Sequence, residues 1–198
     1  MTRRDLHAEI LVQAAPLFIA HGYHGLSMRQ IAEALGVTKA ALYYHFKDKE
    51  TLFLAVLGAY LEKVEEVILQ VQAEGRTSRQ RIRLLVRRLL MQPAERRAVI
   101  RLASQEIAQV SPAARQAFWD TYHEKFIDLI QAILAEGISS GELRPIDPHL
   151  ATWALLGMIH PYLYSAYSDE VKLSDEAIEQ LLTIYLDGIS RPQEGAAG

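Results

Sequence analysis

Cysteine is absent from this chain of 198 residues, which excludes disulfide bridges, thiol catalysis and cysteine-ligated metal sites. A strong charge of one sign is missing too, since the formal net charge is −3 and the pI lies near 6.2. A polyanionic partner would therefore have to meet a local basic patch. No secretory signal is visible, and the longest apolar segment, about residues 150 to 167, is too short and interrupted to span a membrane. We expect a soluble cytoplasmic protein that needs no metal or cofactor.

Alternation of apolar and polar residues with a period of two, which a half-buried strand needs, is also missing. Hydrophobic residues make up half of the chain and recur at intervals of three and four, so the pattern predicts an all-α fold of about nine helices. The expected helices cover about 6–21, 28–35, 39–45, 49–74, 78–92, 94–109, 112–137, 148–167 and 175–187. Their expected N-caps include Ser27, Thr38, Asp48, Ser78 and Ser174.

Residues 27 to 45 contain a short helix, a turn with Gly36 and a second short helix, which is the sequence form of a helix-turn-helix. A helix of about seven residues is marginal by itself and forms only when it docks. The apolar residues expected to hold the two helices together are Ile31, Ala32, Leu35, Val37 and Leu42. The other face of the second helix carries lysine and tyrosine, which need a polar partner.

Hydroxyl and ammonium groups gather around this second helix. Phosphate oxygens of a DNA duplex accept hydrogen bonds from such groups and from helix N-termini. The residues expected to supply these bonds are Ser27, Thr38, Lys39, Tyr44 and Lys49. Base reading then falls to the start and outer face of the second helix, with Arg29 reaching from the first.

The stretch GLSMRQIAEALGVTKAALYYHFKDKETLF resembles the N-terminal DNA-binding domain of the TetR family of bacterial transcription regulators. The resemblance implies a homodimer in which each subunit places its recognition helix in a major groove and a helical C-terminal domain dimerises and binds an effector. It implies recognition positions at Thr38, Lys39, Ala40, Ala41, Tyr43, Tyr44 and His45, and a phosphate contact at Lys49. Ala40 and Ala41 offer only methyl groups, which suit contact with thymine methyls.

The expected domains are 1–48 for DNA binding and 49–191 for effector binding and dimerisation, joined by the long helix that starts near Lys49. The composition of residues 192–198 predicts a disordered tail.

Arginine is frequent between residues 76 and 101, where Glu95 is the only acid. Two interpretations remain open: a solvated face balanced by acids of the preceding helix, or guanidinium groups that hold an anionic effector at the mouth of an apolar pocket. A fatty acid or acyl-CoA matches the second, and a cationic or aromatic compound, as sensed by a multidrug-type regulator, is the alternative. The residues expected at the effector site are Arg87, Arg88, Leu102, Glu106, Phe118, Trp119, Tyr122, Phe126, Met158 and Tyr162.

The last two helices carry more apolar residues than one narrow stripe can bury. They predict a four-helix interface with a second subunit, against the simpler interpretation of an intramolecular core. The residues expected in this interface are Trp153, Leu156, Tyr164, Leu181 and Tyr185.

Residues 137–141 match the pattern G-x-S-x-G, but they follow a helix rather than a strand, so no enzyme is expected. The sequence instead predicts a sequence-specific transcriptional repressor that a small hydrophobic effector releases from a palindromic DNA operator. A helix-turn-helix scaffold without a specific DNA site is the alternative.

Overall fold

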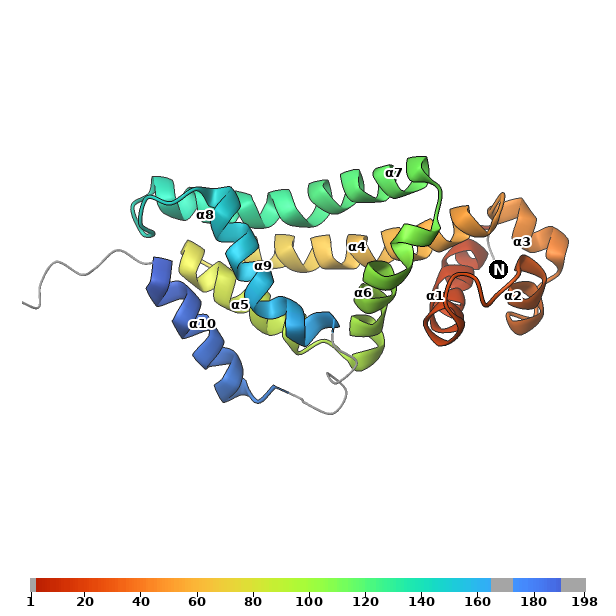
Figure 1. Cartoon of the computed structure of the whole chain (residues 1–198), viewed down its shortest axis with the longest axis horizontal. Helices are drawn as coiled ribbons and strands as arrows, with labels where there is room; N and C mark the ends of the chain where they lie inside the picture. Colours follow the sequence, from red (N-terminus) through yellow and green to blue (C-terminus); the bar gives the residue numbers. More distant parts are fainter. Residues whose placement is uncertain (1–2, 165–172, 190–198) are drawn as a thin grey trace, which may run out of the picture. The chain divides into compact units, whose positions relative to one another are not determined.

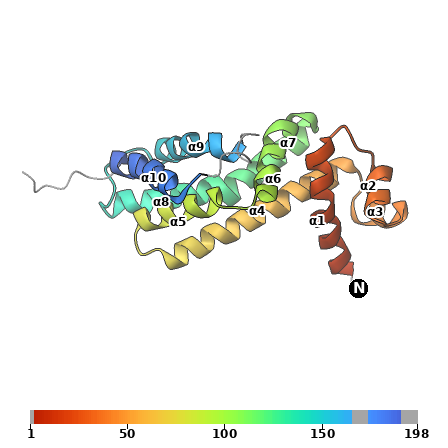
Figure 2. The ribbon, with the colours of Figure 1, turned by 90° about the horizontal axis from the view of Figure 1, so that it is seen from below.

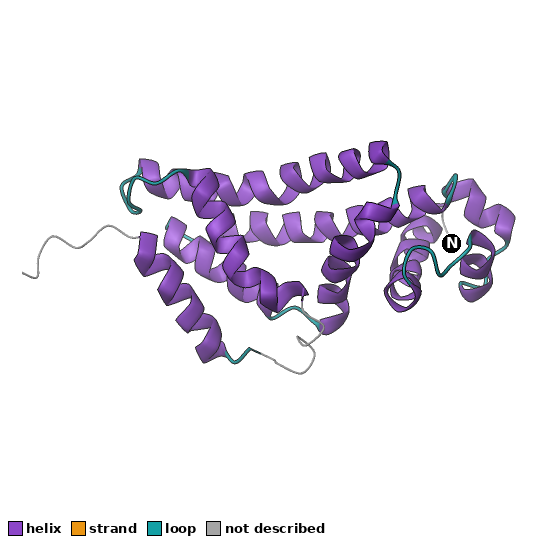
Figure 3. Ribbon diagram, in the orientation of Figure 1, coloured by secondary structure: helices purple, strands orange, loops and turns teal. Residues whose placement is uncertain are grey.

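The computed structural model describes residues 3–164 and 173–189, and these contain helices and loops without any strand (Figure 3). The prediction of an all-α fold is confirmed. Within the same ranges no helix is long and apolar enough to cross a membrane. The predicted tail at 192–198 and the predicted helical residues after 164 lie outside the described residues.

The described helices follow one another in chain order (Figure 1). Their bounds are α1 (Arg3–His21), α2 (Met28–Ala34), α3 (Lys39–His45), α4 (Lys49–Glu74), α5 (Ser78–Leu90), α6 (Ala94–Glu106), η1 (Ile107–Gln109), α7 (Pro112–Tyr122), η2 (His123–Ile127), α8 (Asp128–Ser139), α9 (Pro148–Tyr164) and α10 (Asp175–Ile189). The single helix expected over 112–137 is divided, because the π-helical turn η2 separates α7 from α8. Apolar spacing does not reveal such a turn, since the pattern on either side remains helical.

Local signals set the ends of the N-terminal helices as predicted. Gly22 after α1 and Gly36 after α2 have φ angles of +68° and +66°, a region that favours glycine. Thr51 donates its backbone N–H to Asp48 at 2.7 Å, which caps α4. The prediction that Ser78 caps α5 is wrong. The side chain of Thr77 accepts the capping hydrogen bond from the backbone N–H of Gln80, and Ser78 is the first helical residue.

A first compact unit contains the described residues up to Lys63 together with Pro93–Tyr122. Helices α2 and α3 lie side by side in both ribbon views (Figures 1 and 2). The unit has one apolar core, to which the N-terminal helices contribute Phe18, Ile31, Leu42 and Phe53 and the later segment contributes residues such as Leu102 and Phe118. The division by function into domains 1–48 and 49–191 stays a prediction, whereas packing groups residues 93–122 with the N-terminal helices.

The second compact unit contains Val64–Gln92 and the described residues from His123 onward. Helix α5 packs against α8, α9 and α10. Gly137 of α8 allows a close approach to α5, since a Cβ atom at this position would lie 2.7 Å from the Ser78 Cβ. Tyr185 of α10 is buried, and its hydroxyl donates to the Ala151 carbonyl of α9 at 2.8 Å.

Candidate nucleic-acid interface and effector region

Helix α3 is held in place by a small buried face and a capping bond. Leu42 is fully buried, and Phe46, which directly follows the helix, is almost as buried. Thr38 accepts the backbone N–H of Ala41 at 3.1 Å, which satisfies one of the free donors of the first turn. A helix of seven residues therefore stands on an apolar anchor with a defined start.

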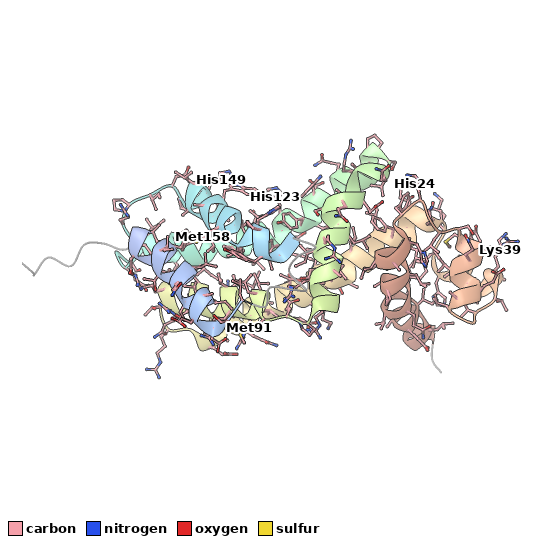
Figure 4. All side chains as sticks on the ribbon, turned by 60° about the horizontal axis from the view of Figure 1, so that its bottom comes forward. His24, Lys39, Met91, His123, His149 and Met158 are labelled. Atoms are coloured by element: carbon pink, nitrogen blue, oxygen red, sulfur yellow. The ribbon has the colours of Figure 1, made fainter. Side chains whose placement is uncertain are left out.

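The opposite face of α3 is polar and accessible. Tyr43 and Tyr44 are 43% and 63% exposed, which is high for aromatic side chains. Lys39 is exposed, projects from α3 (Figure 4), and has its Nζ 5.6 Å from the centre of the Tyr43 ring. The other predicted DNA contacts on exposed positions are Ser27, Arg29, Thr38 and Ala40, and those on half-buried positions are Ala41 and His45. The hydroxyl, ammonium, guanidinium and imidazole groups of this set can donate to phosphates or base edges, and the two alanine methyl groups can contact thymine methyls.

Ser27 has a structural task at the start of α2. Its hydroxyl oxygen accepts the backbone N–H of Gln30 at 3.3 Å, and its own backbone N–H donates to the Gln30 side chain at 2.9 Å. This reciprocal pair is a capping box. The start of α2 is thus fixed by the residue that is predicted to contact phosphate.

His7 of α1 was not expected at this site. Its ring stacks on Phe46 with centroids 4.7 Å apart and meets the edge of His45 at 5.8 Å. His45 in turn meets Tyr44 at 5.3 Å. These ring contacts support the end of α3. The contact of His7 could not be predicted from local sequence signals, because His7 comes from another helix.

Lys49 lies at the first position of α4, but its ammonium points into the unit. The Nζ atom donates to the carbonyls of Tyr23 at 2.7 Å and Leu26 at 2.9 Å, and it lies 4.4 Å from the centre of the Tyr23 ring. Burial lowers the pKa of Lys49. The polar group of this predicted phosphate contact is therefore engaged by carbonyls of the protein itself.

The arginines of α5 form an ion-pair row with α10. Arg87 pairs with Glu179 at 2.8 Å and Asp175 at 3.3 Å, and Arg83 pairs with Glu179 as well. Arg79 pairs with Asp187 at 2.6 Å. We call these pairs the α5–α10 ion-pair row.

Two more arginines of α5 also have carboxylate partners. Arg88 pairs with Glu74 at 2.5 Å, as the interpretation of a balanced, solvated face expects, and Arg81 pairs with Glu136 of α8 at 2.5 Å. Arg87 and Arg88 were both predicted to hold an effector anion. An anion at Arg87 would have to displace its carboxylate partners, whereas the Nη1 atom of Arg88 is buried and has no hydrogen-bond partner among the described residues.

The other residues predicted at the effector site are distributed over both units. Leu102 and Phe118 are buried in the core of the first unit, beside the partly exposed rings of Trp119 and Tyr122 on α7. The carboxylate of Glu106 accepts the backbone N–H of Tyr23 at 3.2 Å.

In the second unit, Phe126 is buried in η2, and Met158 and Tyr162 are half-buried on α9 (Figure 4 labels Met158). The predicted effector-site residues therefore belong to both units, and their role in effector binding stays a prediction.

The predicted dimer residues also differ in their surroundings. Trp153 is exposed, Leu181 is half-buried, and Leu156 and Tyr185 are buried within the subunit. The side chain of Tyr164 lies outside the described residues. Two other apolar residues of the same helices, Leu150 of α9 and Ile184 of α10, are 59% and 66% exposed.

Comparisons with known proteins place this arrangement in a family. The profile described as "Bacterial regulatory proteins, tetR family" matches residues 10–56, and the profile "Tetracyclin repressor-like, C-terminal domain" matches residues 75–188. The chain is 26% identical over 191 residues to the fatty acid metabolism regulator protein of Bacillus subtilis, covering 91% of this chain and 96% of the relative.

It is 30% identical over 196 residues to the transcriptional regulator RutR of Escherichia coli K12, covering 93% and 90%. Among solved structures, that of AibR in complex with isovaleryl coenzyme A and operator DNA matches with a TM-score of 0.71 and 26% identity, covering 94% of this chain and 98% of AibR. Since the C-terminal profile alone spans more than half of the chain, this protein belongs to the TetR family of bacterial regulatory proteins.

Proposed function

We propose that this chain is a homodimeric transcriptional repressor that binds a palindromic operator in the cytoplasm and is released by a fatty acid or an acyl-CoA. The observation that carries the DNA-binding part is α3, a short helix with one buried anchor face and an exposed face of tyrosine, lysine and a capping threonine. Tyrosine hydroxyls and lysine ammonium groups are among the groups that donate hydrogen bonds to DNA phosphates.

Release follows from a population shift. A dimer presents two copies of α3, and these enter successive major grooves only when they lie about one helical turn, roughly 34 Å, apart. An effector that binds more tightly to a dimer with another spacing shifts the population toward that state and so lowers the affinity for the operator. The size of this decrease is limited by the ratio of the effector's affinities for the two states.

The choice of effector rests on the relatives. AibR was crystallised with isovaleryl coenzyme A and operator DNA, and the relative from B. subtilis is named for fatty acid metabolism. Our chain contributes apolar and aromatic side chains at the predicted positions but uses its α5 arginines for internal pairs. We therefore infer that the acyl part supplies most of the affinity, which predicts a dependence on chain length.

Two measurements test the proposal. Selection of bound fragments from random DNA should enrich a palindrome at moderate salt, and failure to enrich one would favour a scaffold without a DNA site. Thermal unfolding with acyl-CoAs of increasing chain length should show stabilisation that follows RT ln(1 + [L]/Kd). The same compounds should release the selected fragment, and stabilisation at no chain length would refute the effector class.

A further inference from the structure

The loop between α1 and α2 has no regular structure of its own from Gly22 to Leu26, yet it ends at the residue that caps α2. Two of its carbonyls, those of Tyr23 and Leu26, accept bonds from the ammonium of Lys49 at 2.7 and 2.9 Å. The backbone N–H of Tyr23 donates to Glu106 at 3.2 Å. Charged side chains thus hold this loop at both sides of one residue.

A lysine ammonium has three N–H donors and no acceptor. In Lys49, two donors are taken by the carbonyls, and the Tyr23 ring lies 4.4 Å away, within the range of a cation–π contact. The ring itself is fixed, because Tyr23 is buried and packs against Phe53 with centroids 5.1 Å apart. Two of the three donors are therefore taken and the cation also faces the ring, so at most one donor is left for a phosphate.

The loop leads directly to the DNA-facing helices. Leu26 precedes Ser27, whose capping box fixes the first turn of α2. Helix α2 packs against α3, and Leu42 of α3 is fully buried in the shared core. A change in the position of the Leu26 carbonyl would therefore reach the recognition helix through two short, rigid steps.

We propose that Lys49 is a positioning residue for DNA binding: its ammonium fixes the α1–α2 loop and, through the Ser27 cap, the placement of α2 and α3, in place of the phosphate contact that the family resemblance implies. The proposal rests on the proposed function insofar as it needs DNA binding to be the activity. Loss of Lys49 leaves the binding-competent arrangement only partly populated, and the apparent Kd rises by the inverse of that population.

The test compares Lys49→Gln with Lys47→Gln in the full-length protein. Lys47 is an exposed lysine two positions earlier and serves as a control for the loss of one nearby charge. Operator affinity is measured from 50 to 300 mM NaCl, and amide hydrogen exchange of residues 22–30 is measured on the free protein. A lost phosphate contact lowers the slope of log K against log [salt] by about 0.9.

We expect Lys49→Gln to weaken operator binding by about tenfold if the competent arrangement falls to about a tenth. Its salt slope should match that of Lys47→Gln, and only Lys49→Gln should accelerate exchange at Ser27 and Gln30. Lys49→Arg, which keeps donors for two carbonyls and can stack on a ring, should restore affinity to within about threefold.

Two outcomes would overturn the proposal. Unchanged exchange with a slope about 0.9 lower than that of Lys47→Gln would make Lys49 a phosphate contact. Faster exchange with unchanged operator affinity would make its role merely structural. If Lys49→Gln does not fold, Tyr23→Leu removes the ring platform but keeps the carbonyls and is judged by the same readouts. If the wild-type protein binds no operator, the proposed function fails, while the exchange measurement still decides whether Lys49 holds the loop.

Discussion

Replacement of Glu179 by glutamine should destabilise the second compact unit. Glu179 is the centre of the α5–α10 ion-pair row, because it pairs with both Arg83 and Arg87, and all three side chains are about one-third exposed. A partly exposed pair contributes about 0.5–1 kcal/mol, so loss of two pairs costs about 1–2 kcal/mol. For a chain of this length, 1 kcal/mol lowers Tm by about 2–4 °C. We therefore expect a decrease of about 2–8 °C.

The assay is thermal unfolding of Glu179→Gln, the wild type and the control Glu62→Gln at low salt and in 1 M NaCl. Glu62 is an exposed acid of α4 that has no ion pair among the described residues. The Debye length falls to about 3 Å at 1 M salt, so the deficit of Glu179→Gln should shrink by more than half there. A deficit that is equal at both salt concentrations, or equal to that of Glu62→Gln, would refute the electrostatic reasoning.

Three further sets of substitutions test other parts of the molecule. Gly58→Ala in α4 and Gly157→Ala in α9 both place a methyl group where nothing lies within 4 Å in the subunit, so each should gain up to about 1 kcal/mol of helix stability. Because α9 is one of the two helices predicted to form the dimer interface, only Gly157→Ala should raise the dimer dissociation constant in sedimentation experiments; equal behaviour would place Gly157 outside the interface. Thr38→Ala removes the cap of α3, which costs about 1 kcal/mol, and should weaken operator binding in a fluorescence anisotropy titration, whereas Thr38→Ser should retain it. Hydrogen bonds from the Thr51 backbone N–H and hydroxyl lower the pKa of Asp48; its stabilisation is therefore present above about pH 4 and is lost as pH falls through the lowered pKa. Asp48→Asn should flatten this acid limb of the pH–stability curve, and an unchanged limb would contradict the assignment.

The helix-turn-helix could be predicted almost residue by residue because its signals are local. The caps Ser27 and Thr38 and the glycine at 36 act within four residues of their own positions. Burial of Leu42 follows from the apolar spacing on a helix too short to stand alone. Sequence reasoning is strongest where cause and effect lie within one helical turn.

The partners of the arginines could not be predicted in the same way. Arg79, Arg83 and Arg87 repeat every four residues, and the acids that they meet on α10 lie at 175, 179 and 187, which are four and eight residues apart. Both stripes are visible in the sequence. Their pairing depends on which helices pack together and in which register, and this information is distributed over the whole core rather than written in either helix.

Lys49 shows the limit of transferring a role by resemblance. Its position after Asp48 matches a phosphate contact, but nothing near it in the sequence indicates that two carbonyls and a ring more than twenty residues earlier take up its donors. Glu106 is a similar case, since its partner, the Tyr23 amide, lies 83 residues away. Polar contacts of this range follow from tertiary packing.

The core of the first compact unit is assembled from two separate stretches of chain, and this limits how the protein can be recombined. A fragment that ends at Lys63 would lack Leu102, Ile107 and Phe118 and would leave part of the core that contains Phe18 and Phe53 uncovered. A chimera that joins the helix-turn-helix to another effector domain should therefore contain residues 93–122 along with the N-terminal helices. In evolution, the same shared core makes the folding of the N-terminal helices depend on the sequences of α6 and α7. These two helices are therefore less free to diverge than their position in the predicted effector-binding domain suggests.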